Sequence, residues 1–239
     1  MKLMKTKEIL EIGCGQGFNT YLLSKNKLNS VIGIDLSVKD IKIAQQRYPG
    51  ITFSMMNAEK LKFKDNSFDY VIALQILEHV DNLDQVLDEI ARVLKVKGRL
   101  VASIPFYKSE KWLLKVRPSY FKEIHHVRIF KYNELEKHCQ HKGLTLVKKK
   151  RVGFLQHVEL YLLFKRKITS NNQTSIGSWR DTFWTKTVHA IMLFFDPICL
   201  QTPLKFFPIW IIAIPFGFVI NFIGNIFFPK SLDYEFIKE

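Results

Sequence analysis

The chain has few cysteines, and the three that it has form no recognisable pattern. Cys14, Cys139 and Cys199 are the only cysteines among its 239 residues. Their spacing matches no metal-binding pair, and an odd number cannot close a complete set of disulfides. The sequence therefore argues against a disulfide-rich scaffold and a cysteine zinc site, and it predicts a reducing compartment. No secretory signal is expected, because the first predicted strand begins within a few residues of Met1.

Acidic residues are too few to balance the basic ones, and nearly all of the imbalance lies in one block. The chain has 36 lysines and arginines against 22 aspartates and glutamates, a formal net charge of +14. Residues 111–186 contain 17 basic and only 5 acidic side chains. A basic block directly before an apolar region predicts contact with an anionic membrane surface. A nucleic-acid-binding surface and an ordinary solvated, lysine-rich surface are the alternatives.

Charge is absent from residues 206–228, a run of 23 residues that includes FFPIWIIAIPF. A membrane span needs about 20 apolar residues, and membrane helices tolerate proline and glycine when neighbours satisfy the backbone. Residues 183–195 have the spacing of an amphipathic helix that lies in the membrane interface. We therefore expect residues 183–228 to contact or cross a bilayer, with the basic block on the cytoplasmic side. A soluble helical cap is the alternative.

The remaining pattern predicts three regions: a globular domain over 1–167, a polar linker over 168–178 and a hydrophobic C-terminal region over 179–239. In the first region, strand-like apolar runs alternate with amphipathic helical stretches. Seven strands are expected, at residues 7–12, 30–34, 51–55, 68–73, 99–104, 144–152 and 158–166. Such alternation predicts an α/β fold with a doubly wound, mostly parallel sheet that binds its ligand at the strand carboxyl ends.

Three glycines follow the first predicted strand at every second position. Gly13, Gly15 and Gly17 lie between that strand and a predicted helix, where glycine permits a sharp turn and close approach of a ligand. By itself such a loop can be an ordinary tight turn. The dinucleotide fingerprint needs its third glycine at Phe18, so the spacing favours S-adenosylmethionine over a nicotinamide cofactor. Asp35, which closes the second strand, is placed to accept the hydroxyls of a ribose.

Two later segments complete a family pattern. They are MMNAEKLKFKDNSFDYVIALQILEHV at residues 55–80 and KVKGRLVASIPF at residues 95–106. With the glycine loop and Asp35, they make residues 7–165 similar to class I S-adenosylmethionine-dependent methyltransferases of the broad type 11 group. The resemblance implies a Rossmann-like methyltransferase fold and S-adenosylmethionine as the methyl donor.

The resemblance also implies which residues hold the donor. Glu11 is expected near the amino group of the methionine moiety, the three loop glycines allow close approach, and Asp35 binds the ribose. The residues expected beside the adenine or the methionine end are Leu36, Asn57, Ala58, Leu74 and Gln75. Core packing is the alternative for Leu36, Ala58 and Leu74. Relatives usually have aspartate at the position of Asn57, so the affinity for the donor is expected to differ.

The segment QILEHV, residues 75–80, is similar to the E-x-x-E-H pattern of quinone-precursor O-methyltransferases, which is linked with a divalent metal. Here Gln75 replaces the first acid, and only Glu78 and His79 remain. This set suits magnesium poorly, because magnesium prefers carboxylates and water. We therefore predict no metal, and we expect Glu78 and His79 to orient the loop over the methionine tail.

Two histidines, His125 and His126, precede VRIF, which resembles the H-x-R-x-F segment of many relatives. A neutral imidazole can accept the proton of an acceptor hydroxyl near neutral pH. His126 and His79 are therefore candidate catalytic residues, with a helix cap or a lid as the alternative for His126. Positioning alone can supply much of the rate of methyl transfer.

These observations predict a membrane-associated methyltransferase that modifies a lipid-linked or amphipathic small molecule. A second hypothesis is an adaptor at the membrane that binds S-adenosylmethionine without catalysis, suggested by Asn57 and Gln75. A third is an RNA methyltransferase that uses the basic block. No nucleic-acid-recognition module is visible in the sequence, so nucleic acid is not the expected partner.

Overall fold

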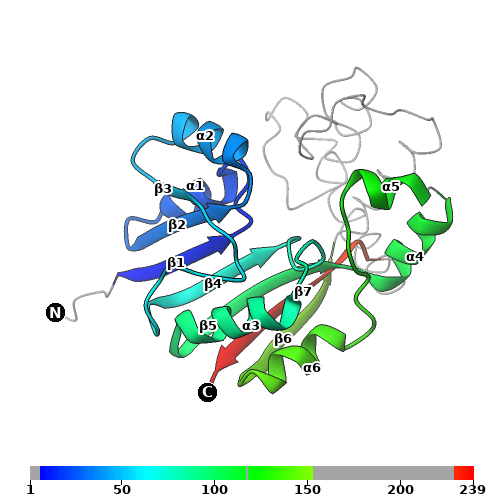
Figure 1. The fold of residues 1–239 in the computed structure, drawn as a ribbon. Helices are drawn as coiled ribbons and strands as arrows, with labels where there is room; N and C mark the ends of the chain where they lie inside the picture. Colours follow the sequence, from blue (N-terminus) through cyan, green and yellow to red (C-terminus); the bar gives the residue numbers. More distant parts are fainter. Residues whose placement is uncertain (1–5, 117, 153–228) are drawn as a thin grey trace, which may run out of the picture. The chain divides into compact units, whose positions relative to one another are not determined.

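The computed structural model describes residues 6–116, 118–152 and 229–239, which form a seven-stranded sheet with helices (Figure 1). The strand order is β3-β2-β1-β4-β5-β7-β6. The strands are β1 (Lys7–Ile12), β2 (Asn29–Asp35), β3 (Thr52–Met55), β4 (Phe68–Leu74), β5 (Leu94–Pro105), β6 (Leu144–Val152) and β7 (Ser231–Lys238). The helices are α1 (Phe18–Ser24), α2 (Val38–Arg47), α3 (Leu83–Val93), α4 (Tyr107–Val116), α5 (Pro118–Glu123) and α6 (Glu134–His141). The predicted α/β class and the seven-stranded sheet are confirmed.

Five neighbouring strands, from β3 to β5, run parallel to one another. Ile12 near the end of β1 pairs with Ile34 of β2 and Ala73 of β4, and Asp35 pairs with Met55 of β3. Parallel strands in this register all end at the same edge of the sheet. The loops that leave β1 to β4 therefore meet there, as expected for a ligand-binding edge.

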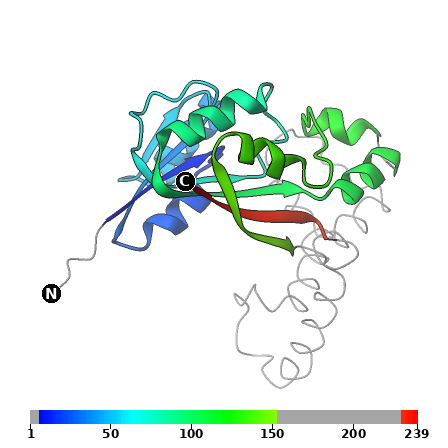
Figure 2. The same cartoon turned by 90° about the horizontal axis from the view of Figure 1, so that it is seen from below.

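Alternating residues of β1 supply both faces of the sheet, because successive side chains point to opposite sides of a strand. Leu10 and Ile12 belong to the main buried cluster, together with apolar residues of α3 and α6, whereas Ile9 belongs to a smaller cluster against which Leu23 of α1 packs. The apolar residues of α3 recur at three- and four-residue steps, which buries one face of the helix. Figure 2 shows α1 on the opposite side of the sheet from α3 and α6.

The seventh strand comes from the end of the chain, which is a correction to the predicted domain limits. Residues 231–238 were expected in the hydrophobic C-terminal region, but as β7 they lie in the sheet between β5 and β6. The physical reason is a period-two pattern: Leu232, Tyr234 and Phe236 are all buried in the main core. The strand predicted at 158–166 and the linker at 168–178 lie outside the described residues.

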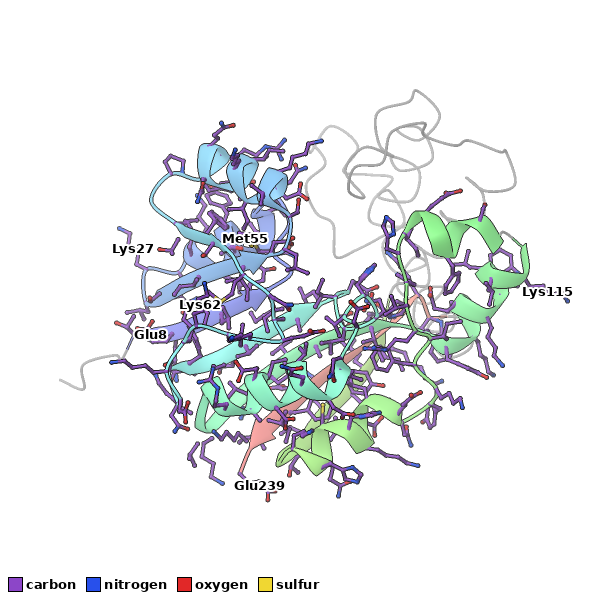
Figure 3. The ribbon with its side chains drawn as sticks, viewed as in Figure 1. Glu8, Lys27, Met55, Lys62, Lys115 and Glu239 are labelled. Carbon is purple, nitrogen blue, oxygen red and sulfur yellow. The ribbon has the colours of Figure 1, made fainter. Side chains whose placement is uncertain are left out.

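β7 runs antiparallel to both of its neighbours. The Lys230 amide donates to the Val152 carbonyl at one end of β6, and the Glu239 amide donates to the Gly143 carbonyl beside the other end. Glu239, labelled in Figure 3, therefore lies at the amino edge of the parallel strands, as does Glu8 of β1. The start of β7 consequently lies at the opposite edge, where the ligand is expected.

α3 ends earlier than predicted. The apolar steps after Asp81 and the glycine at position 98 predict a helix over this stretch, but α3 ends at Val93, and β5 begins at Leu94. Phe68 of β4 pairs with Leu94, while Tyr70 pairs with Arg99, so the intervening residues of β5 form a bulge. Glycine at position 98 leaves room for this bulge, because a Cβ atom there would lie only 2.7 Å from the Lys95 carbonyl oxygen.

α4 and α5, which were not predicted, belong to a second compact unit. Within residues 6–116, 118–152 and 229–239, no helix combines the length and the hydropathy needed to cross a bilayer. The amphipathic segment predicted at 183–195 and the span predicted at 206–228 lie outside the described residues.

Candidate active site

The glycine loop turns the end of β1 back over the end of β2. Gly13, Gly15 and Gly17 have φ angles of 72°, 50° and 83°, the left-handed region that glycine adopts without strain. The amides of Gly13 and Cys14 both donate to the Ile34 carbonyl, at 2.8 and 2.9 Å. Gly17 then caps the amino terminus of α1. The sequence interpretation of a strand-to-helix glycine turn is therefore confirmed.

The three glycines serve two different purposes. A Cβ atom on Gly13 would lie 2.6 Å from Cγ1 of Ile76, and one on Gly17 would lie 2.6 Å from Cζ of Phe53. A Cβ atom on Gly15 would meet no atom of the described residues within 4 Å. Gly13 and Gly17 thus permit tight packing within the protein, whereas the backbone of Gly15 borders open space that a ligand can approach.

Asp35 joins the loop to the end of β2. One carboxylate oxygen accepts a hydrogen bond from the Gly15 amide and the other from the Ser37 amide, both at 2.8 Å. Each carboxylate oxygen has two lone pairs, so both oxygens retain the capacity to accept a ligand hydroxyl. The next residue, Leu36, is 64% exposed. Core packing, the alternative for Leu36, is therefore wrong, and an apolar surface adjoins the carboxylate.

Glu11 is buried at the end of β1, where only 2% of its surface is exposed. Its carboxyl accepts a hydrogen bond from the Thr20 hydroxyl. Burial raises the pKa of Glu11 to about 7, because desolvation disfavours the charged form more than the hydrogen bonds to Asn19 and Thr20 favour it. The carboxyl is therefore poised to ionise near neutral pH, and an arriving cation would favour ionisation.

The turn after β3 contains Asn57 and Ala58. The Met56 amide donates to the Asp35 carbonyl at 3.0 Å, which holds this turn beside the end of β2. Asn57 is exposed, and its side-chain oxygen accepts a hydrogen bond from the Glu59 amide at 2.8 Å. Ala58 is 8% exposed and belongs to the main core. The side chain of Ala58 thus packs in the core, and Asn57 presents its amide to solvent.

A chain of hydrogen bonds supports Gln75 at the end of β4. Gln75 has a φ of 53°, which is uncommon for a residue other than glycine, and its amide donates to the Ser103 carbonyl at 2.8 Å. Its side-chain nitrogen donates to the Ser103 hydroxyl at 2.9 Å, and this hydroxyl donates to Asp233 of β7 at 2.8 Å. Burial raises the pKa of Asp233. Leu74, beside Gln75, is half-buried and packs on the smaller core cluster.

The sequence interpretation missed Ser103 and Asp233. No signal in the sequence links either residue to Gln75, because the link depends on β7 lying beside β5. Replacing Ser103 with alanine removes the partner of the Gln75 side chain. We expect this change to weaken donor binding about 3- to 10-fold, the equivalent of about one hydrogen bond. Calorimetric titration measures the effect.

Ser67→Ala is the matched control for that experiment, because Ser67 lies beside the opposite end of β4 and donates its hydroxyl to the Lys64 carbonyl. It should leave the affinity for the donor unchanged. Equal affinities in Ser103→Ala and Ser67→Ala would show that the Gln75 side chain does not contribute to the site.

His79 and His126, far apart in the sequence, are brought together. Their ring centroids are 4.7 Å apart, with an edge-to-face angle of 77°. The Val127 amide donates to the Glu78 carbonyl at 3.0 Å, which joins the segment after α5 to the turn after β4. Glu78 is 1% exposed. The two histidines that were predicted separately, from the QILEHV segment and from the segment before VRIF, therefore lie next to each other.

Comparison with known proteins agrees with this geometry. Residues 10–102 match the family model described as "Methyltransferase domain". Demethylmenaquinone methyltransferase of Tropheryma whipplei is 37% identical over 98 residues, which is 40% of this chain and 40% of that protein. Phthiotriol/phenolphthiotriol dimycocerosates methyltransferase 1 of Mycobacterium ulcerans is 36% identical over 98 residues, 40% of this chain and 36% of that protein. The chain thus spans about two fifths of the length of these curated relatives.

Solved structures show the same fold. A protein from Pyrococcus horikoshii has a TM-score of 0.53 and 26% identity, covering 64% of this chain and 79% of that one. Phosphoethanolamine N-methyltransferase 2 of Haemonchus contortus, solved in complex with S-adenosyl-L-methionine, has a TM-score of 0.59 and 17% identity. That match covers 98% of this chain and 49% of the other. Because the sequence identity is low, it supports a similar fold and nothing more specific. Residues 10–102 therefore form a methyltransferase domain similar to those of S-adenosylmethionine-dependent methyltransferases, in agreement with the family and the methyl donor predicted from the sequence.

Proposed function

We propose that this protein transfers a methyl group from S-adenosylmethionine to a lipid-linked or amphipathic small molecule on the cytoplasmic side of a membrane. One observation carries the catalytic part of the proposal. The open backbone at Gly15, the carboxylate of Asp35 and the exposed side chain of Leu36 adjoin one another at the carboxyl edge of the parallel strands. A backbone donor, a diol acceptor and an apolar surface are the features that a nucleoside needs.

Each end of the donor has a proposed partner. Asp35 accepts the ribose hydroxyls, Leu36 packs beside the adenine, and Asn57 meets the adenine amine through its side-chain oxygen. At the other end, Glu11 offers a carboxylate to the methionine ammonium, and the Leu74–Gln75 turn lines the methionine chain. Because the strands that bear or precede these residues end at one edge of the sheet, the proposed donor contacts all come from that edge.

The acceptor class is proposed from the relatives and from charge. The two curated relatives are named for demethylmenaquinone and for phthiotriol dimycocerosates, both of which are lipid-like. On the described part of the basic block, Lys148, Lys150 and Arg151 of β6 are exposed. Anionic headgroups attract such residues, each by about 1 kcal/mol near the surface. The apolar residues 183–228 would add hydrophobic contact with the membrane.

Methyl transfer itself requires an acceptor atom in line with the sulfonium, and correct positioning supplies much of the rate. For a hydroxyl acceptor, a base must take up the proton. His126 and His79 lie together and are the proposed candidates for this step.

Replacing Asp35 with alanine should weaken binding of S-adenosylmethionine by about 1.5–3 kcal/mol, roughly 10- to 150-fold, because charged hydrogen bonds to the ribose are lost. Calorimetry on the full chain measures this directly. Asp65→Ala is the control, because Asp65 is an exposed aspartate that pairs with Arg92 on the surface. An unchanged affinity in Asp35→Ala would mean that the ribose binds elsewhere.

The acceptor is identified by supplying S-adenosylmethionine with a labelled methyl group together with a total membrane-lipid extract, soluble metabolites or RNA. The proposal expects label in the lipid fraction with the wild-type protein and none with Asp35→Ala. Tight donor binding without any labelled product would support the non-catalytic adaptor instead. Label in RNA, lost at high salt, would support the third hypothesis.

Membrane contact is tested by sedimentation with vesicles, with and without anionic lipid. Because β7 completes the sheet, truncation of residues 180–239 would remove a core strand and confuse folding with binding. The informative variant replaces several apolar residues within 206–228 by aspartate and keeps residues 229–239. Equal sedimentation of this variant and the wild type would contradict the membrane proposal.

A further inference from the structure

We propose that Glu78, His79 and His126 form a binding site for a divalent transition-metal ion. Each side chain offers one ligand atom, and the three atoms lie within 4.8 Å of one another. The sequence interpretation predicted no metal because it took Gln75 as the third member of the set. The structure brings in His126 instead, from a segment that follows α5, and this changes the chemistry of the set.

The backbone holds the two contributing segments together. The Val127 amide donates to the Glu78 carbonyl at 3.0 Å. The Arg128 guanidinium donates to the Leu77 carbonyl at 3.1 Å and to the Asp81 carbonyl at 2.8 Å. Three hydrogen bonds from consecutive residues thus fix the segment that bears His126 against the turn that bears Glu78 and His79. Ligands held in this way lose little freedom when an ion binds.

The orientation of His79 suits a metal ligand. Its Nδ1 atom lies 3.1 Å from the His125 carbonyl oxygen, and a carbonyl only accepts hydrogen bonds, so Nδ1 carries the hydrogen. In the neutral ring the lone pair is therefore on Nε2, the atom that would face an ion. Metal-binding histidines commonly donate their other ring nitrogen to a carbonyl in this way. His125 has a φ of 54°, an uncommon conformation of the kind that recurs at ligand-binding sites.

The ligand types select the class of ion. Two imidazole nitrogens and one carboxylate oxygen suit zinc, iron, cobalt or nickel, whereas magnesium requires oxygen ligands. Bonds of about 2.1 Å place neighbouring ligand atoms roughly 3–3.5 Å apart, so side-chain rotation must draw the atoms together around the ion. Glu78 is 1% exposed, and both histidines are half-buried. Three protein ligands leave coordination positions open to water or to an oxygen of a small molecule.

The test is metal binding by the full chain, purified without a histidine tag and stripped with a chelator. Calorimetric titration with zinc should give one site per chain. Cobalt, added in place of zinc, should produce visible absorption bands typical of nitrogen and oxygen ligands in a low-coordinate site. His126→Gln and His79→Gln should each weaken zinc binding about 100-fold or more. His141→Gln is the control, because His141 is an exposed histidine on α6.

His126→Gln alone decides the outcome if His79→Gln does not fold, which circular dichroism and thermal unfolding would show. Zinc affinity of His126→Gln equal to that of the wild type, or the absence of a stoichiometric site, would overturn the proposal. Binding of S-adenosylmethionine is measured on the same samples. Loss of metal with retained donor binding supports a separate metal site, whereas stoichiometric metal without donor binding would contradict the proposed function and leave the metal site intact.

Discussion

Replacing Gly17 with alanine is expected to lower the free energy of unfolding by about 2–5 kcal/mol. Two costs add. Gly17 has a φ of 83°, and the left-handed conformation costs any other residue about 1–2 kcal/mol. The new Cβ atom would also lie 2.6 Å from Cζ of Phe53 and 2.9 Å from Cβ of Ala44, where overpacking of a well-packed site costs about 1–3 kcal/mol. Chemical denaturation of the full chain measures the loss.

Gly15→Ala is the matched comparison, because it changes the same loop in the same way. Its φ of 50° brings the strain, but in the part of the chain that the structure describes its Cβ atom would meet no atom within 4 Å. We expect a loss of only about 1–2 kcal/mol in stability, together with weakened binding of S-adenosylmethionine, because the methyl group would enter the space proposed for the donor. Equal losses of stability in the two variants would contradict the assignment of Gly17 to packing and Gly15 to the ligand.

The stability of the ligand-free protein should fall by about 3 kcal/mol as Glu11 ionises with rising pH. The pKa of Glu11 is about 7 in the folded protein against an ordinary value of 4.5, chiefly because the carboxyl is buried. The folded state therefore holds this proton more tightly than the unfolded state. The contribution is present in full below pH 4.5 and is lost as the pH rises through about 7. Denaturation curves between pH 4 and 8 should record this decline.

Glu11→Gln isolates this contribution, because glutamine still accepts the hydrogen bond from Thr20 but cannot ionise. The difference in stability between wild type and variant should change with pH, because contributions common to both proteins cancel. The pKa values of Asp69 and Glu89 are lowered by hydrogen bonds to Lys95 and Arg92, against the opposing effect of burial. Their contribution to stability therefore rises with pH, in the opposite direction to that of Glu11 and at lower pH. Parallel stability curves for the two proteins would contradict the raised pKa.

The same carboxyl gives a signature of donor binding. If the methionine ammonium lies beside Glu11, it stabilises the carboxylate and lowers its pKa. Binding of S-adenosylmethionine near pH 6.5 should then release protons, and the measured binding enthalpy should depend on the ionisation enthalpy of the buffer. Glu11→Gln should reduce this dependence.

The parallel part of the fold and its glycine turn could be predicted from the sequence because both depend on local signals. Parallel strands inside a sheet are buried on both faces and tend to be apolar throughout, as in the run VIAL of β4. Gly13, Gly15 and Gly17 mark a turn that other residues enter only with strain, and a carboxylate after the next strand is readable in the same way. These features placed Glu11 and Asp35 correctly at the ends of their strands.

What the sequence could not determine depends on contacts between distant segments. β7 follows a long apolar run, and that run led to the prediction that the whole C-terminal region contacts a membrane. Only the structure shows that β7 belongs to the sheet and buries Leu232, Tyr234 and Phe236 in its core. The support of Gln75 by Ser103 and Asp233 follows from that strand pairing.

The sequence by itself determined the parallel part of the sheet, the glycine loop and the family, because each follows from patterns within a few residues. Only the tertiary structure decided which residues share a site. His126 lies beside Glu78 and His79 because Val127 and Arg128 bond to the turn after β4. The hydrophobic periodicity of a sequence does not predict such a contact. The contact forms only when the folded chain brings hydrogen-bond donors of one segment next to the carbonyl groups of another. The third ligand of the proposed metal site therefore comes from another part of the chain, where the sequence pattern does not indicate it.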